Sequence, residues 1–378
     1  MTTTSGIEVR TVAGHEPAGR TCRWLLTFGL ALGPLVGSAD VGDARTLASG
    51  LSNPRGIAFA PNGELWVAEG GRGGPGPCFP SPSNPAVVRC YGETGSIARI
   101  LPEGGFERIV TGLPSLTLPD GTMEGGPTDL SFLGASAYLV LGLSGGPAIR
   151  QAIGGQARLL GQVLHVTPGG SYQVVGDVAG HEASHNPAGN AVDSNPYGIR
   201  ALPGRRLVAD AGGNSVIELL ANGHTRTFAI PPAGANGQSV PTSVAEGLDG
   251  ALYVGLLTGF PFFRGAAQVL RISSDGSSVE TFTPGLTAVV DVTFDNGGAL
   301  YVLEIASGQV PPFPPPNPGL GIGRLLRQCP GDMPEILLTG LTFASGVAIG
   351  PDDAAYLTNF SVSPTGGEVL RLPLTPCP

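Results

Sequence analysis

The stretch that decides the fold runs from residue 53 to residue 69 and reads NPRGIAFAPNGELWVAE. It holds two short apolar segments separated by Pro61-Asn62-Gly63, and Glu69 ends the second one. Asn-Gly between two apolar runs is a strong signal for a tight hairpin turn. The stretch therefore predicts two antiparallel strands joined by a short turn.

The same pattern recurs along the chain. The corresponding first strands begin at Pro127, Pro196, Pro241, Val290 and Ser345. Each is followed by a turn, an apolar second strand and a third strand, such as QVLHV at 162–166 or QVLRI at 268–272. Four antiparallel strands per unit, at a spacing of about 45 to 70 residues, are typical of propeller blades.

The last of these six units lacks a fourth strand. The segment RTLASGL at 45–51 is similar to the fourth strands ERIVTGL at 107–113 and EILLTGL at 335–341. We therefore expect an all-β fold, a six-bladed β-propeller with four antiparallel strands per blade. The ring would be closed by the N-terminal strand, Arg45 to Leu51, pairing with residues 368–371, which removes the exposed edges of an open array.

Composition agrees with many short strands. The chain has 61 glycines and 36 prolines, a level that alone would suggest disorder. However, only 13% of the residues are charged and 41% are hydrophobic, so the chain has enough apolar surface to fold. Because glycine and proline destabilise helices, strands and turns are the expected elements.

Charge excludes some partners. The net charge is −9, and all 20 basic residues are arginines, so no lysine can form a Schiff base. No run of basic residues offers a surface for nucleic acid or for an anionic membrane. The expected partner is a small molecule or a cell-envelope component, and the protein is expected to be a monomer.

The first 39 residues have the features of a signal peptide. Three arginines precede an apolar run at 24–36, and small residues at 37–39 could be a cleavage site. The run is too short to span a bilayer comfortably, although the long leader leaves an uncleaved anchor as the alternative. We expect a single propeller domain at 40–378, secreted or periplasmic.

Four segments, at 49–74, 193–216, 240–262 and 364–372, resemble the ScyD/ScyE family of exported bacterial proteins, a group near the NHL-like repeat propellers. The family takes its name from clusters for the pigment scytonemin, but most members have no assigned activity. The resemblance implies a six-bladed propeller and export. It implies no particular reaction.

Blade topology places the long loops on one face. The first strand runs down the central axis and the second returns, so loops between strands two and three share a face with the blade-to-blade crossovers. We call this face the top. The bottom turns are short, and long loops on one face of a rigid scaffold are where binding sites are usually built. Lid or packing material is the alternative.

The same topology limits how the cysteines can pair in disulfides. Removal of the leader takes away Cys22 and leaves an even number, as expected of disulfides in an oxidising compartment. Of the three possible pairings, only Cys78–Cys90 and Cys329–Cys377 keep both partners on one face.

The mouth of the central channel, on the top face, is the expected site. The residues placed there are Glu69, Asp129, Asn195, Asp210, Asp291, Glu304 and Asn359. Asp129, Asn195 and Asp291 are candidate ligands for Ca²⁺, which prefers oxygen ligands, and related lactonases and arylesterases use such a site. The alternative is structural, since an acid after strand two can bond loop amides, as Glu69, Asp210 and Glu304 would do.

The predicted ligand-binding set is Asp129, Tyr197, Asp210, Asp291 and Glu304. Aromatic side chains on the top segments could stack on a planar ligand or pack the loops together: Tyr197, Phe260, Phe262, Phe263 and Phe313. We expect Asp129 and Asp291 to be innermost, because they open first strands beside the axis.

Residues 181–185 read HEASH and match the zinc-binding pattern H-E-x-x-H. The following Asn186-Pro187 would end a helix at once, so a surface loop is the favoured interpretation. Two classes of function remain. The leading one is a binding module or scaffold of the cell envelope, and the alternative is a Ca²⁺-dependent hydrolase or a lyase.

Overall fold

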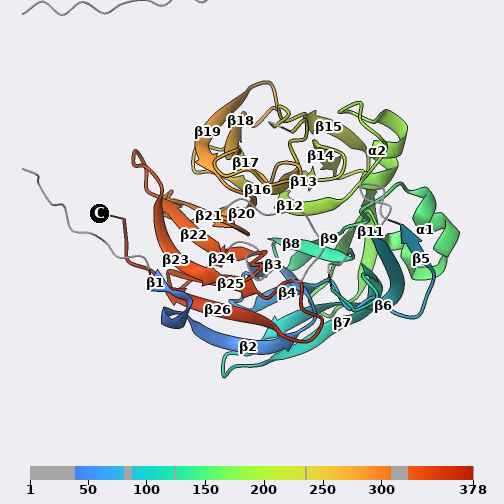
Figure 1. Ribbon diagram of the computed structural model, residues 1–378, viewed down its shortest axis with the longest axis horizontal. Helices are drawn as coiled ribbons and strands as arrows, with labels where there is room; N and C mark the ends of the chain where they lie inside the picture. Colours follow the sequence, from blue (N-terminus) through green and yellow to red (C-terminus); the bar gives the residue numbers. More distant parts are fainter. Residues whose placement is uncertain (1–38, 81–86, 123–124, 235, 308–321, 378) are drawn as a thin grey trace, which may run out of the picture. The chain divides into compact units, whose positions relative to one another are not determined.

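Six β-sheets surround a common axis in the computed structural model, which describes residues 39–80, 87–122, 125–234, 236–307 and 322–377 (Figure 1). Each sheet is a blade with four antiparallel strands, and the first strand of each blade lies nearest the axis. The predicted six-bladed propeller is confirmed.

The strand bounds follow the repeats. Blade 1 contains β3 (Pro54–Phe59), β4 (Leu65–Glu69), β6 (Val88–Ile100) and β7 (Phe106–Thr117). Blade 2 contains β8 (Pro127–Leu133), β9 (Ser136–Leu141), β10 (Gln162–Val166) and β11 (Tyr172–Asp177). Blade 3 contains β12 (Pro196–Leu202), β13 (Arg205–Asp210), β14 (Ser215–Leu220) and β15 (Thr225–Ala229).

The second half of the ring repeats the order. Blade 4 contains β16 (Pro241–Glu246), β17 (Leu252–Leu256), β18 (Ala267–Ile272) and β19 (Val279–Leu286). Blade 5 contains β20 (Val289–Phe294), β21 (Leu300–Glu304), β22 (Gly323–Gln328) and β23 (Glu335–Leu341). Blade 6 contains β24 (Val347–Ile349), β25 (Ala354–Asn359), β26 (Gly367–Pro373) and β2 (Arg45–Leu51).

Several short elements lie outside the four main strands of each blade. They are β1 (Ala39–Asp40), which lies parallel to β23, η1 (Val41–Asp43), β5 (Cys78–Pro80), which pairs with β6, α1 (Ala148–Ile153), η2 (Gly155–Leu159) and α2 (Val178–His185). The helix α2 begins at its N-cap Asp177, whose carboxylate accepts the Gly180 N–H at 2.9 Å. It lies in the crossover from blade 2 to blade 3.

The second strands are mostly apolar because each sheet packs between two others. Every residue of β4 (LWVAE), β17 (LYVGL) and β21 (LYVLE) is buried. The core consists of clusters between neighbouring sheets. Trp66 of blade 1, for example, is 2% exposed and contacts Phe132 of blade 2 edge to face.

The N-terminal strand closes the ring as predicted. Strand β2 pairs antiparallel with β26, in a register that sets Arg45 opposite Arg371 and Leu51 opposite Gly367. Blades 6 and 1 also meet through Phe59 and Tyr356, whose ring centroids lie 4.9 Å apart. Strand β2 and the last described strand, β26, thus share one blade.

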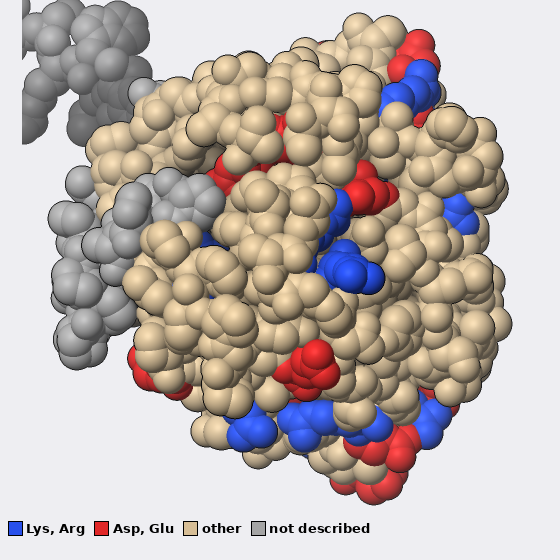
Figure 2. Space-filling view, turned by 90° about the vertical axis from the view of Figure 1, so that its right-hand side faces the viewer, with Lys and Arg blue, Asp and Glu red and all other residues tan. Residues whose placement is uncertain are grey.

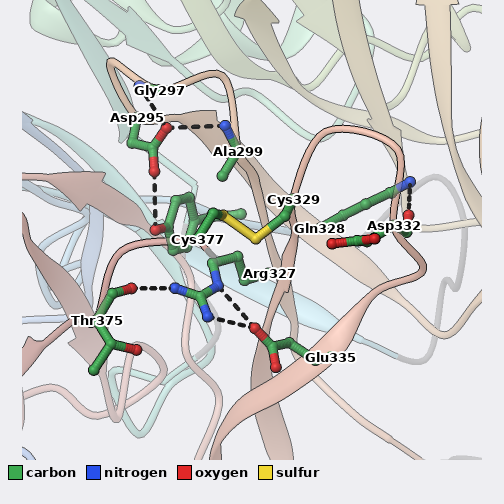
Figure 3. Close-up of a disulfide and its surroundings, with 11 residues drawn as sticks. Asp295, Gly297, Ala299, Arg327, Gln328, Cys329, Asp332, Glu335, Thr375 and Cys377 are labelled. Carbon is green, nitrogen blue, oxygen red and sulfur yellow. Dashed lines mark hydrogen bonds and ion pairs between the residues drawn. A yellow bond between two sulfur atoms is a disulfide. The ribbon is translucent and has the colours of Figure 1, made fainter.

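Both predicted disulfides are confirmed. Cys78–Cys90 joins β5 to β6, and Cys329–Cys377 ties the C-terminal tail of blade 6 to the bottom turn of blade 5 (Figure 3). The predicted signal peptide lies outside the described residues, apart from Ala39 in β1.

Charged side chains are sparse on the face shown in Figure 2, and its basic and acidic groups lie next to one another. Several arginines pair with acids on their own blade, including Arg99 with Glu64 and Arg271 with Glu280. Within the described ranges, no helix is long and apolar enough to cross a membrane.

Candidate functional site

Three polar side chains meet at the top mouth of the channel. Arg55 of blade 1 donates from Nη1 to the Tyr197 hydroxyl of blade 3 at 2.9 Å and to Ser345 Oγ, at the start of blade 6, at 3.2 Å. The Tyr197 and Ser345 hydroxyl oxygens lie 3.1 Å apart. We call Arg55, Tyr197 and Ser345 the mouth cluster. It joins blades that are far apart in the sequence.

Tyr197 reaches across the channel to make these contacts. Its ring packs against the core cluster of blades 5 and 6, which includes Val290 and Val347. The Arg55 guanidinium carbon lies 5.6 Å from the centroid of the Tyr197 ring, within the range of a cation–π contact. Arg55 is only 7% exposed, whereas Tyr197 is half-buried. The tyrosine therefore offers the more accessible surface of the two.

Asp129 and Asp291 lie one residue further along their first strands, in blades 2 and 5. Asp129 accepts the N–H of Leu130 and, from blade 3, the N–H of Ile199, both at 2.8 Å. Asp291 accepts the N–H of Val292 and, from blade 6, that of Val347, again at 2.8 Å. Each carboxylate thus links its own first strand to the next blade.

A neighbouring glycine makes room for Asp129. A Cβ atom at Gly56 of blade 1 would lie 2.0 Å from Asp129 Oδ1, a separation that no side chain can adopt. The glycine in the stretch NPRGIAF is therefore required by the close approach of the next blade, rather than by its own turn.

The two aspartates influence each other's charge. Burial raises the pKa of Asp129 to about 7, and the N–H bonds from Ile199 and Leu130 act in the opposite direction. Burial, followed by the charge of Asp129, raises the pKa of Asp291 well above its ordinary value. Both residues are half-buried, so solvent still reaches part of each. Two carboxyl groups from blades three apart in the ring thus interact across the axis.

The acids that end second strands serve their own blades. Asp210 is fully buried and accepts bonds from Ser194 Oγ at 2.7 Å, the Asn195 N–H at 2.7 Å and the Gly213 N–H at 3.1 Å. Glu304, also fully buried, accepts the Thr287 N–H at 2.7 Å and pairs with Arg324. Neither carboxylate can meet a ligand unless its loop moves.

Glu69 and Asn359 occupy the equivalent positions. Glu69 accepts the Ser52 N–H at 2.7 Å, and Asn359 accepts the Thr342 N–H at 2.8 Å. In four blades, the residue that ends strand two therefore bonds the crossover that leads into the same blade. This arrangement matches the structural alternative expected from the sequence.

The oxygens of two of the three predicted calcium ligands already accept backbone hydrogen bonds. Both oxygens of Asp129 and of Asp291 already accept N–H groups, and Asn195 Oδ1 lies beside Gly142, where a Cβ atom would be 2.6 Å away. Across the part of the chain that the structure describes, no three His, Cys, Asp or Glu side chains are grouped as a metal ion would require.

The HEASH segment forms a helix, α2, rather than the expected surface loop, and both ring nitrogens of His181 lie beside threonine hydroxyls. His181 is 4% exposed, and its ring nitrogens lie 3.1 Å from Thr225 Oγ1 and 3.0 Å from Thr227 Oγ1. His185 stacks on His181, with ring centroids 4.3 Å apart. His181 therefore anchors the helix on β15, and His185 stacks on it.

Glu182 turns to the other side of α2 and joins a buried acidic group. A Cβ atom at Gly213 would lie 2.9 Å from Glu182 Oε2 and 3.0 Å from Asp210 Oδ2, so the two oxygens approach the same glycine. Burial, then the charges of Asp210 and Asp193, raises the pKa of Glu182 to about 7. Burial likewise raises the pKa of Asp210 to about 6. Ionised Glu182 is therefore unfavourable in the fold.

This group predicts a pH dependence of stability. A folded-state pKa above the unfolded value means that stability is greatest at low pH and falls as the pH rises from about 4.5 through about 7. We expect the substitution E182Q to raise the free energy of unfolding by about 2 kcal/mol at pH 8 and by less than half of that at pH 5, measured by urea unfolding. The control E103Q, at an exposed position, should show no such pH dependence. If the difference in unfolding free energy between E182Q and the unmodified protein is the same at pH 5 and pH 8, the prediction is wrong.

The aromatic residues of the top loops divide between packing and exposure. Phe262 packs against the small cluster of Ala288 and Ala306, and Phe260 contacts it edge to face at 5.6 Å. Phe260 and Phe263 remain 44% and 41% exposed. Phe313 lies outside the described residues.

Comparisons with known proteins show the fold. One solved structure, a Bacteroides thetaiotaomicron protein of unknown function, matches with a TM-score of 0.53 and 9% identity, over 88% of this chain and 74% of that chain. A streptogramin B lyase matches with a TM-score of 0.48 and 16% identity, over 86% and 96% of the two chains. A luciferin-regenerating enzyme gives 0.49 and 12%, over 86% and 92%. The structural neighbours are propeller proteins.

No family model and no curated protein matches the sequence. At these identities, a likeness in fold carries no function with it, because one fold hosts many functions. The residues of the site must therefore supply the functional argument.

The sequence missed two members of the mouth cluster. Arg55 and Ser345 are 290 positions apart, and neither belongs to a motif. Their signal was positional only, since both lie at the start of a first strand, as Tyr197 does.

Proposed function

We propose that this protein is an exported binding propeller of the ScyD/ScyE kind, which holds a small molecule or an envelope component at the top mouth of its channel. The mouth cluster is the observation that supports this proposal. It brings a guanidinium, a phenol and a hydroxyl from three blades to one point. Asp129 and Asp291 lie just below it.

The chemistry of the cluster favours a planar ligand with a carboxylate or carbonyl oxygen. Arginine presents a planar fork of donors that suits carboxylates, and aromatic faces stack on flat molecules. Tyr197 keeps part of its surface accessible, and Phe260 and Phe263 expose further aromatic surface on a top loop. Asp210 and Glu304 are left out of the ligand set, because both are fully buried and hold their own loops.

Export is part of the proposal. Disulfides form and persist in oxidising compartments, and the chain carries two. The predicted leader at 1–39 would deliver the chain there. We propose a secreted or periplasmic monomer.

The binding site can be tested by titrating the protein with 2-naphthoate and recording the fluorescence of the naphthoate. We expect saturable binding that weakens about tenfold in R55K, because lysine lacks the planar fork, and by several-fold in Y197F, which loses only the hydroxyl. The control R271A removes an arginine that pairs with Asp249 and Glu280, away from the mouth, and should bind as the unmodified protein does. Equal affinity of all variants for 2-naphthoate would contradict the proposal.

The alternative function is a Ca²⁺-dependent hydrolase or a lyase. Elemental analysis, together with melting curves in Ca²⁺ and in a chelator, separates the two classes. We expect a melting temperature that is indifferent to both additions. A stoichiometric Ca²⁺ ion and a clear stabilisation by Ca²⁺ would instead favour the hydrolase.

A further inference from the structure

A cavity lies on the bottom face of the propeller, opposite the mouth cluster. It has a volume of about 320 Å³, at the lower end of the range for small-molecule sites. Its walls are the turn that follows β20 (295–299), the turn of blade 6 at Asp353, and the C-terminal tail from Leu374 to Cys377. Both turns connect a first strand to a second, so the cavity is on the bottom face.

The C-terminal tail is held in place as one wall. The Cys329–Cys377 disulfide fixes its end to blade 5, and Arg327 donates from Nη1 to the carbonyl oxygen of Thr375 (Figure 3). The Arg327 side chain is 5% exposed, and its Nε also donates to Glu335 at 2.9 Å. The tail is therefore a built wall of the cavity.

The floor of the cavity is apolar. Tyr301, which is 2% exposed, lies there with Ile349 and Leu374, and all three belong to the core cluster of blades 5 and 6 or pack against it. Burial, then the charge of Asp295, raises the pKa of Tyr301 to about 12, so its hydroxyl stays protonated and donates to Asp295 Oδ2 at 3.1 Å. The floor can accept a hydrocarbon body.

The charged groups of the wall are carboxylates. Asp295 Oδ1 accepts the N–H groups of Gly297 and Ala299, both at 2.9 Å, which fixes the carboxylate in the turn (Figure 3). Asp353 is exposed at the other side. None of the described lining residues is basic, and Arg327 is already engaged with Glu335 and Thr375. Apolar walls with two carboxylates, of which Asp295 is held in place by its turn, attract a cation with an apolar body.

We propose that this cavity, the tail cavity, binds a small primary ammonium compound, with its charged group between Asp295 and Asp353 and its hydrocarbon body on Tyr301, Ile349 and Leu374. The compound would be an aralkyl or alkyl amine of about ten non-hydrogen atoms, given the volume. This site is independent of the ligand proposed for the top face.

Fluorine NMR titration of the full chain with 4-fluorobenzylammonium tests the proposal. The neutral 4-fluorobenzyl alcohol and the anionic 4-fluorophenylacetate serve as matched probes. We expect a dissociation constant in the millimolar range for the ammonium, and at least fivefold weaker binding of the alcohol and the carboxylate.

Matched variants locate the binding. D353N and D295N should each weaken the ammonium about fivefold, and asparagine can adopt the positive φ of 52° found at Asp353. The control D332N removes an equal charge from an exposed residue of the bottom turn after β22 that does not line the cavity, and should bind unchanged. Melting curves check that all three variants are folded.

Three outcomes would overturn the proposal. One is no saturable binding of the ammonium at 10 mM. Another is equal binding of the ammonium and the alcohol, which would mean that the carboxylates play no part. The third is an equal loss in D332N, which would show a diffuse effect of surface charge.

Discussion

Replacing Glu69 with alanine is expected to lower the free energy of unfolding by about 3 to 5 kcal/mol, because two buried donors, the Ser52 N–H and Ser96 Oγ, lose their acceptor and the half-exposed Arg108 loses its partner. The Glu69 side chain is fully buried and pairs with Arg108, whose Nε and Nη2 lie 2.7 and 2.8 Å from its oxygens. It also accepts Ser96 Oγ at 2.6 Å and the Ser52 N–H at 2.7 Å. Each of these donors would be left without its acceptor.

The position of Glu69 adds to the expected effect. Ser52 follows β2 directly and leads the chain from the closing blade into blade 1, so the Glu69 bond fixes the entry to the ring. Urea unfolding followed by circular dichroism measures the loss.

The matched control for Glu69 is E107Q. Glu107 also pairs with an arginine on blade 1, Arg99, but its side chain is 47% exposed. Exposed ion pairs contribute about 0 to 1 kcal/mol, so E107Q should remain close to the unmodified protein. A loss below 1 kcal/mol in E69A would contradict the importance assigned to this buried pair.

Removing the Cys329–Cys377 disulfide by the double substitution C329S/C377S is expected to cost about 4 kcal/mol. The two cysteines are 48 positions apart, and the chain-entropy model gives this value for a loop of that length. The shorter loop of Cys78–Cys90, with a separation of 12, should be worth about 3 kcal/mol. Replacing both cysteines together avoids a free thiol.

Ligand binding gives this prediction a second measurement. Without the disulfide, the tail from Leu374 to Cys377 loses its covalent tie to blade 5, and the tail cavity loses a fixed wall. C329S/C377S should therefore lose both stability and affinity for 4-fluorobenzylammonium, whereas C78S/C90S should lose stability alone. Equal unfolding midpoints for the unmodified protein and C329S/C377S would contradict the prediction.

The fold could be predicted because the same local pattern, two apolar strands joined by a tight turn, recurs in every blade. The turn at Pro61-Asn62-Gly63 and the apolar strands beside it recur, and the missing fourth strand of the last unit pointed directly to residues 45–51. The structure bears out this closure in the pairing of β2 with β26. Here local sequence and global fold agree, as they do in a minimally frustrated protein.

The contacts of the site could not be predicted in the same way. The sequence placed Asp129 and Asp291 beside the axis, but their bonds to Ile199 and Val347 of the next blades depend on the exact stagger between sheets. Such contacts join residues with no shared pattern.

The tail cavity was hidden for a different reason. The bottom turns are short, so the sequence points to the long loops of the top face as the place for a binding site. The cavity arises because the tail folds back across blade 5, where Arg327 and Cys329 hold it. The sequence predicts the Cys329–Cys377 disulfide, but no local pattern around Arg327 indicates its bond to the Thr375 carbonyl.

Because β2 pairs with β26, the ring can close only after the last strand has been synthesised. Arg45 cannot pair with Arg371 until the ribosome has added about 320 further residues. At ordinary rates of synthesis this takes roughly 16 to 65 s. Until then, blade 6 has no outer strand and blade 1 has no neighbour on one side. The earliest part of the propeller to be made is thus among the last to be fixed, and the ring stays open for as long as the chain is being made.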